Sequence, residues 1–232
     1  MNEKIRHVCH RREFVRNTVL GTGALVMSGA LINTSGAFGQ EAKTAAGKTT
    51  IPDLGPLVLI PDVKIRMRQA NAFLVGVSPS EEIEISLRDV IKIHGFCAGG
   101  STLVFRQAQE ALKVLFGDEL PVRQGIKVET AYHCCQAGAV AYITGTVMSA
   151  INRLGDLVLL PEETRKVVFT DKRNGKNVTV QPLVDPHAIF SPLFKQMIQD
   201  NSTAPQVRKL LNETVQDYIN SPWQKLFTLT LG

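Results

Sequence analysis

The strongest periodic pattern lies in the middle of the chain. In residues 103–115, leucine, valine and alanine recur at the spacing of one helix face, and Gly117 follows as a stop signal. The pattern predicts a helix that opens at Cys97 and ends at Gly117. Just before it, the run Ser-Leu-Arg-Asp at 86–89 resembles a capping box, which predicts a shorter helix ending at His94.

Alternation with a period of two marks the first expected strand of a sheet. In residues 125–132, Ile126, Val128 and Thr130 share one side of an extended segment. An alanine-rich helix is expected next, from residue 134 or 135 to residue 143. Apolar runs predict further strands at residues 57–60, 73–77, 157–160, 166–170, 176–183 and 226–231, with a hairpin around 171–175. Amphipathic helices are expected at residues 191–199 and 205–219.

The order of these elements predicts the fold class. A helix, a strand and a helix are followed by three strands, and the last helices and a final strand come after them. Helices and strands that do not alternate regularly are typical of an α+β protein. We therefore expect an α+β fold with a mixed sheet and helices packed on it.

The first forty residues have the layout of an export signal. A basic stretch up to Arg16 precedes the uncharged, mildly apolar residues 17–33, and small residues at 37 and 39 suit cleavage before Gln40. The apolar run is shorter than the roughly 20 residues of a membrane span. Its Arg-Arg-Glu-Phe-Val-Arg motif at 11–16 resembles the twin-arginine consensus. We predict a twin-arginine signal peptide at residues 1–39 and a periplasmic mature protein with no stable membrane anchor.

Removal of this leader changes the charge of the chain. Residues 1–39 hold five Lys and Arg and two Asp and Glu, so the formal net charge falls from +5 to +2. A nearly neutral chain gives no support for nucleic-acid binding. Residues 40–55 are expected to be a flexible lead-in, and residues 56–232 are long enough for a single domain with its own core.

Cysteine and histidine gather in one part of the mature chain. Cys97, Cys134 and Cys135 are all of its cysteines, and His94 and His133 are two of its three histidines. An odd number of cysteines in an oxidising compartment argues against a simple disulfide framework. The cysteines stand at predicted helix starts, where the helix dipole favours the thiolate that binds metals. A metal site, a redox dithiol and cysteines that only pack in the core all agree with this pattern.

The segment that contains this cluster resembles the FmdE family, named after a component of formylmethanofuran dehydrogenase. The run Leu-Arg-Asp-Val-Ile-Lys-Ile-His-Gly-Phe-Cys-Ala-Gly-Gly at 87–100 is similar to the family's short helix and His-Gly-His-x-Cys-Pro-Gly motif. Later blocks are matched by Val-Glu-Thr at 128–130, the cysteines at 134–135, Thr-Gly at 144–145 and the tail at 221–229. Arg106 stands near an arginine of the family's long helix. The resemblance covers residues 84–231 and implies an FmdE-like fold.

The resemblance also implies a metal site. Its expected ligands are His94, Cys97 and Cys135, with Cys134 or His133 as a fourth ligand or neighbour, and the expected metal is zinc or another divalent transition metal. The chain departs from the family motif in having a single histidine, three residues before the first cysteine, and Ala98 in place of proline.

The two adjacent cysteines and the nearby polar residues are expected to differ in their roles at the metal site. Counting back from Thr-Gly at 144–145 favours Cys135 over Cys134 as the family's cysteine. Glu129 and Tyr132 are candidates for a proton donor or acceptor, although a structural role is the commoner outcome for such residues. His187 is expected in a loop.

These features together predict an exported metal-binding protein whose reaction is not assigned. Its expected partners are the metal ion and the twin-arginine translocase, with a homodimer or a periplasmic redox enzyme that it assists as further candidates. Nucleic acid is not expected as a partner. The alternative is a thiol–disulfide redox protein that uses Cys97, Cys134 and Cys135.

Overall fold

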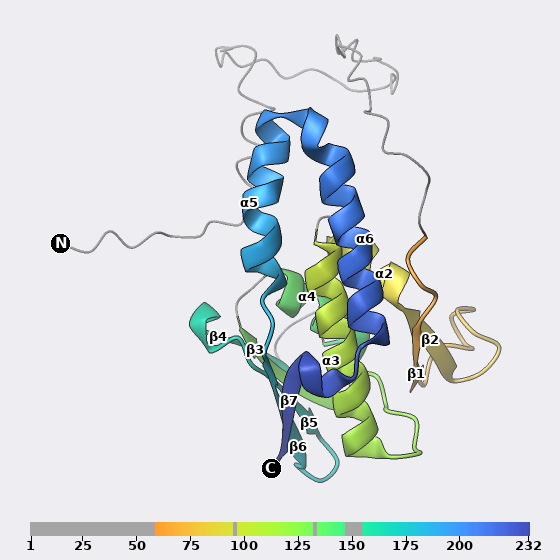
Figure 1. Ribbon diagram of the computed structural model, residues 1–232. Coiled ribbons are helices and arrows are strands. Elements are labelled where there is room, and N and C mark those ends of the chain that lie inside the picture. Colours follow the sequence, from red (N-terminus) through yellow and green to blue (C-terminus); the bar gives the residue numbers. More distant parts are fainter. Residues whose placement is uncertain (1–58, 95–96, 132–133, 147–154) are drawn as a thin grey trace, which may run out of the picture. The chain divides into compact units, whose positions relative to one another are not determined.

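A five-stranded mixed sheet, a layer of helices and a separate two-stranded hairpin make up the fold (Figure 1). The computed structural model describes residues 59–94, 97–131, 134–146 and 155–232, which belong to one compact unit. The predicted signal peptide (1–39) and lead-in (40–55) lie outside these residues. The α+β class with a mixed sheet is confirmed.

The sheet has the strand order β4-β3-β5-β6-β7. β3 and β4 are parallel, and the other neighbours are antiparallel. The strands are β3 (Ile126–Ala131), β4 (Leu157–Leu160), β5 (Val167–Asp171), β6 (Asn177–Pro182) and β7 (Phe227–Leu231). All five were expected from the sequence, within one or two residues at their ends.

One face of the sheet carries the core. Alternate residues of β3, β5 and β6 are fully buried, and α3 and α4 pack on this face. The buried strand residues are Ile126, Val128, Val167, Phe169, Val178 and Val180. The intervening residues face the other way, where Lys127 forms an ion pair with Glu129 at 2.9 Å. The alternation read from the sequence thus reports which side of the sheet the helices cover.

The helices are α2 (Leu87–His94), α3 (Ala98–Phe116), α4 (Cys134–Thr144), α5 (Pro186–Gln199) and α6 (Ala204–Asn220). Short 3-10 turns occupy η2 (Glu162–Thr164), η3 (Asn201–Thr203) and η4 (Trp223–Lys225). At the start of α2, the Ser86 hydroxyl accepts a bond from the Asp89 N–H and donates one to its carboxylate. The hydrogen bond from the Ser86 hydroxyl to the carboxylate holds the pKa of Asp89 below its usual value. The capping box predicted at 86–89 is confirmed.

The largest difference from the expected elements lies before α2. Residues 73–77 were predicted as a strand, but they form an exposed turn between β1 (Lys64–Arg68) and β2 (Glu82–Ser86). In this antiparallel hairpin Ile65, Met67, Ile83 and Ile85 are buried. Cross-strand ion pairs join Lys64 to Glu84 and Arg66 to Glu82 on the opposite side. Of the other strand predicted here, residues 59–60 are irregular and residues 57–58 lie outside the described part of the chain.

The helix predicted at residues 191–199 begins five residues earlier. Asp185 caps α5 by accepting the N–H groups of His187 and Ala188 at 3.1 and 3.2 Å, and Pro186 takes the first helical position. Both are standard helix-start signals. α5 and α6 form an antiparallel pair that packs on α3 (Figure 1). The Trp223 and Phe227 rings stack at 5.7 Å near the end of the chain, so their expected packing role is confirmed.

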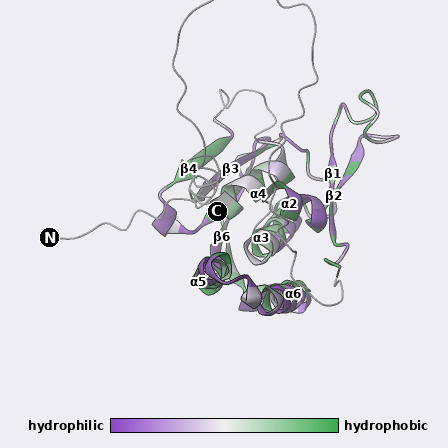
Figure 2. Ribbon diagram, turned by 90° about the horizontal axis from the view of Figure 1, so that it is seen from above, coloured by the Kyte–Doolittle hydropathy of each residue, from purple (hydrophilic) through white to green (hydrophobic). Residues whose placement is uncertain are grey.

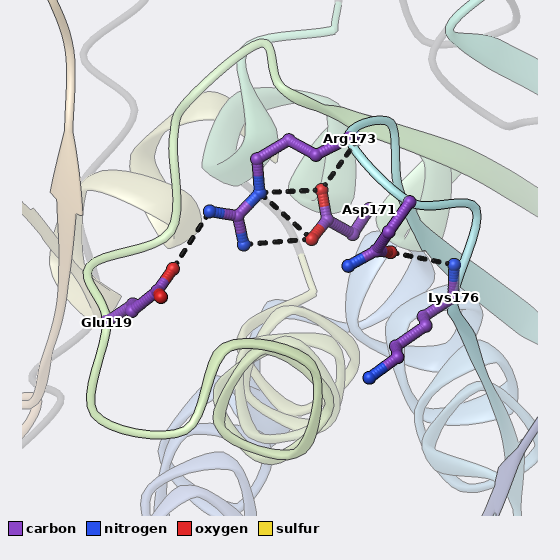
Figure 3. A network of polar contacts seen from close by, with 5 residues as sticks. Glu119, Asp171, Arg173 and Lys176 are labelled. Carbon is purple, nitrogen blue, oxygen red and sulfur yellow. Dashed lines mark hydrogen bonds and ion pairs between the residues drawn. The ribbon is translucent and has the colours of Figure 1, made fainter.

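A polar network ties the β5–β6 turn to the loop after α3 (Figure 3). The carboxylate of Asp171, which is 1 % exposed, accepts bonds from the backbone N–H and the guanidinium of Arg173. The same guanidinium reaches Glu119 at 2.8 Å.

None of the helices in the described ranges is long and apolar enough to cross a membrane.

Candidate functional site

Cys97 stands at the N-cap of the longest helix of the described chain. Its sulfur accepts a hydrogen bond from the Gly100 N–H at 3.3 Å, in the way that a Ser or Asp oxygen does at other helix starts. The residue is 6 % exposed. Because the free N–H groups of α3 and the positive end of its dipole point at the sulfur, this position favours an anionic sulfur.

Cys135 reaches the same place from the first turn of α4. It is 3 % exposed. A Cβ atom built on Gly100 would lie 2.9 Å from the Cys97 sulfur and 3.3 Å from the Cys135 sulfur. Both sulfurs therefore lie within 3.3 Å of one point, although the residues come from separate helices. The missing side chain of Gly100 is what lets them approach.

A third helix start lies at the same end of the sheet. A Cβ atom on Gly99, in the first turn of α3, would lie 2.9 Å from the ring of Phe190 in α5. The first turns of α3 and α4 meet at Gly100, and the first turn of α3 meets α5 at Gly99. The N-terminal ends of α3 and α4 thus lie at the two sulfurs, and the positive ends of these helix dipoles stabilise negative charge there.

Tyr218 of α6 belongs to these surroundings. It is 5 % exposed. Burial raises the pKa of its phenol to about 12, with smaller contributions from negative charge that include Asp185 and Cys97. The phenol therefore keeps its proton at neutral pH and remains a hydrogen-bond donor.

Two buried hydroxyls that lie near the cysteines along the chain have no hydrogen-bond partner among the described residues. Ser101 follows Gly100 in the first turn of α3, and Thr130 lies on the helix-facing side of β3, close before α4. Both residues are fully buried. An unsatisfied buried hydroxyl costs about 1–3 kcal/mol, so these two groups are available to a bound ligand or water.

The structure brings together two of the four predicted metal ligands, Cys97 and Cys135. His94 is the last residue of α2 and Cys134 the first of α4, but their side chains lie outside the described part of the molecule, as do residues 132–133. Among the described side chains, no group of three His, Cys, Asp or Glu forms a metal-binding cluster, and Cys97 and Cys135 are not in a disulfide. The four-residue ligand set therefore stays a prediction.

The other residues singled out from the sequence have clear positions. Glu129 pairs with Lys127 on the sheet face opposite the helices, which is a structural role. His187 was expected in a loop but is half-buried in the first turn of α5. Arg106 lies in α3 and pairs with Glu110 at 3.2 Å.

Sequence reasoning missed Tyr218 and Ser101. Tyr218 has no sequence signal of its own, because its place depends on how α6 packs. Gly100 does have one: a glycine inside the first turn of a strongly periodic helix costs stability, and such a residue commonly marks a close approach.

Comparisons with known proteins agree with the resemblance noted in the sequence. The family model described as "FmdE, Molybdenum formylmethanofuran dehydrogenase operon" matches residues 93–228. No curated protein sequence matches the chain. Among solved structures, the chain is similar to a tungsten formylmethanofuran dehydrogenase FmdE-like protein from Syntrophus aciditrophicus. The two are 18% identical with a TM-score of 0.39, over 64% of this chain and 72% of the other.

Proposed function

The chain belongs to the FmdE family, whose model matches more than half of it, and from this premise we propose that it is an exported metal-binding protein. The proposed metal is zinc. Its ligands are Cys97, Cys135 and His94, with Cys134 or His133 as a fourth ligand or neighbour.

The observation that carries this proposal is the convergence of two buried sulfurs over Gly100. Zinc binds thiolates at about 2.3 Å, and two buried sulfurs that both lie within 3.3 Å of the same point beside Gly100 are near enough to act as neighbouring ligands of one ion. Helix N-termini favour the thiolate form at both positions. His94 precedes Cys97 by three residues at the end of α2, which packs against both α3 and α4. The donor set therefore fits a soft divalent metal.

The reaction is not assigned. With three protein ligands, and with Cys134 and His133 as neighbours only, a bound zinc ion would keep an open position and would supply Lewis acidity toward water or a small substrate. Around it, the Ser101 and Thr130 hydroxyls offer hydrogen bonds that the described fold leaves unused. Tyr218 adds a phenol that stays protonated at neutral pH. The proposed role of assisting a periplasmic redox enzyme rests on the export route, since the twin-arginine pathway carries folded, often cofactor-loaded, proteins.

Export through the twin-arginine route is part of the proposal. The motif at 11–16 and the small residues before Gln40 support it. A thiolate metal site gains from this route, because the metal can be loaded in the reducing cytoplasm before export. We expect the double change Arg11→Lys and Arg12→Lys to keep the chain in the cytoplasm, as measured by cell fractionation. Unchanged export of that variant would contradict the twin-arginine assignment.

Metal analysis of the purified protein tests the site. We expect about one zinc per chain, and thiols that react with a thiol reagent only after chelation. Cys97→Ser and Cys135→Ser should each lose the metal. Leu112→Ala, which opens a cavity in the same helix about three turns beyond Gly100, is the matched control and should keep it.

Full metal content in both cysteine variants would refute the site. A wild-type protein without metal, whose Cys97 and Cys135 form a disulfide on mild oxidation, would instead support the thiol redox alternative.

A further inference from the structure

The loop between β1 and β2 exposes an apolar tip. The exposed fractions are 56 % for Phe73, 75 % for Leu74, 62 % for Val75 and 67 % for Val77. The twelve residues from Gln69 to Ser80 include no charged side chain. Figure 2 shows this loop at the outer end of β1 and β2, with apolar colouring. Large apolar side chains exposed together mark an interaction site more often than chance surface residues do.

Part of the backbone of the same loop is bonded internally. The Ala72 carbonyl accepts the N–H groups of Val77 and Ser78 at 2.9 and 3.3 Å. The N–H groups of Ala72, Val75 and Gly76 also donate to carbonyls within the loop. The tip therefore turns apolar side chains outward while these polar backbone groups bond to one another. Such a loop enters an apolar medium without leaving those donors unpaired.

The charges at the base of the loop cancel in pairs. Arg66 pairs with Glu82, and Arg68 lies 4.0 Å from Glu81. A neutral base neither attracts nor repels an anionic surface strongly. Any attachment through this loop is therefore driven by apolar burial and depends little on salt.

The tip also has no packing role in the described fold. The hairpin's buried side chains belong to the strands, and Ala72 is the one residue next to the 73–77 tip that is fully buried. The family model begins at residue 93, so the whole hairpin lies outside the matched part. The exposed side chains serve neither the core nor the cysteine site.

We propose that this loop, residues 69–80, inserts its apolar tip into the surface of a lipid bilayer and holds the protein there peripherally. A protein partner would be expected to form hydrogen bonds around an apolar centre, whereas this tip has no charge and keeps most of its backbone donors occupied. Only the side chains of Phe73, Leu74, Val75 and Val77 enter the bilayer, so the protein stays at the membrane surface.

Fluorescence from a tryptophan at the tip tests the proposal in the full chain. Trp223 is the only tryptophan of the sequence, so Leu74→Trp is placed in a Trp223→Phe background. With phosphatidylcholine vesicles, we expect a blue shift of the emission and quenching when the lipid chains carry bromine. Both effects should persist at high salt.

The matched control is Ile198→Trp in the same background, at an exposed position of α5 with 59 % of its side chain accessible. Its emission should not respond to the vesicles. An unchanged spectrum at position 74 would overturn the proposal and favour a protein partner for the tip. An equal response at both positions would also overturn it, because it would indicate general adsorption.

Discussion

At the scale of single residues, Gly100 has the most specific role. Cys97 and Cys135 are the groups a side chain there would meet, at 2.9–3.3 Å. Glycine is an unfavourable residue in a helix, yet at position 100 it leaves the space in which the side chains of two cysteines from different helices approach each other. The chemistry proposed for the site depends on this absence of a side chain.

Gly100→Ala tests that dependence. Alanine favours a helix over glycine by about 0.5–1 kcal/mol, so a change without steric cost would stabilise the protein. We expect destabilisation instead, because the new methyl group must displace both sulfurs. The measurement is the free energy of unfolding in urea.

Gly138→Ala is the matched control for this experiment. Gly138 also lies inside a helix, and a Cβ atom there would meet nothing within 4 Å. It should gain the helix preference of roughly 0.5–1 kcal/mol. If both variants were equally stable, the close approach over Gly100 would have no energetic weight.

At the scale of elements, the two hairpins are fixed by different forces. The β1–β2 hairpin buries one side in the core. The β5–β6 turn is held by a buried carboxylate, Asp171, whose hydrogen bonds from Arg173 hold its pKa below the usual value (Figure 3). Arg173 also lies over the ring of Phe116 at 5.1 Å, which connects the turn to the end of α3.

Arg173→Ala should therefore destabilise the protein, because it leaves the buried carboxylate of Asp171 without its cationic partner. Glu119→Ala removes only the exposed partner of the same guanidinium and should cost less than about 1 kcal/mol. Urea unfolding at neutral pH compares the two variants, and we expect the larger loss for Arg173→Ala. Equal effects would show that the buried carboxylate does not control the turn.

The same pair gives a pH dependence with a defined sign. Since the folded pKa of Asp171 is depressed, its contribution is present above the unfolded pKa of about 3.9 and is lost as the pH falls through the folded pKa. Arg173→Ala should flatten this acid part of the stability curve, as measured by urea unfolding at a series of acid pH values.

At the scale of the whole molecule, the core crosses the limits of the family match. Ile65, Met67, Ile83 and Ile85 from the hairpin join the same cluster as Val90 and Phe105. The strands before residue 93 are therefore part of the core, while the tip of the loop between them lies outside it.

Met67→Ala should cost about 2–5 kcal/mol, the range for large core residues, because Met67 is fully buried. Leu74→Ala, at the 75 % exposed tip of the same hairpin, is the control and should leave stability within about 0.5 kcal/mol. Calorimetric unfolding compares the two. A small effect of Met67→Ala would mean that the hairpin is only loosely attached to the core.

Local pattern determined most of the secondary structure in advance. The capping box at 86–89, the stop at Gly117 and the alternation in β3 are each decided by neighbours within a few residues, and all three are confirmed. The run Phe-Leu-Val-Gly-Val at 73–77 was wrongly predicted as a strand, because apolarity alone does not distinguish a buried strand from an exposed turn. The charged alternation of Lys64–Arg68 and Glu82–Ser86 held the better strand signal.

The sequence by itself also singled out Cys97 and Cys135, since sulfur at a helix start is visible in one dimension. Only the tertiary structure decided that the two sulfurs meet over Gly100, that the buried Tyr218 lies near Cys97, and that Glu129 points away. The physical reason is that these facts depend on how separate elements pack. Packing is set by the summed burial of many side chains, and no short stretch of sequence contains that sum.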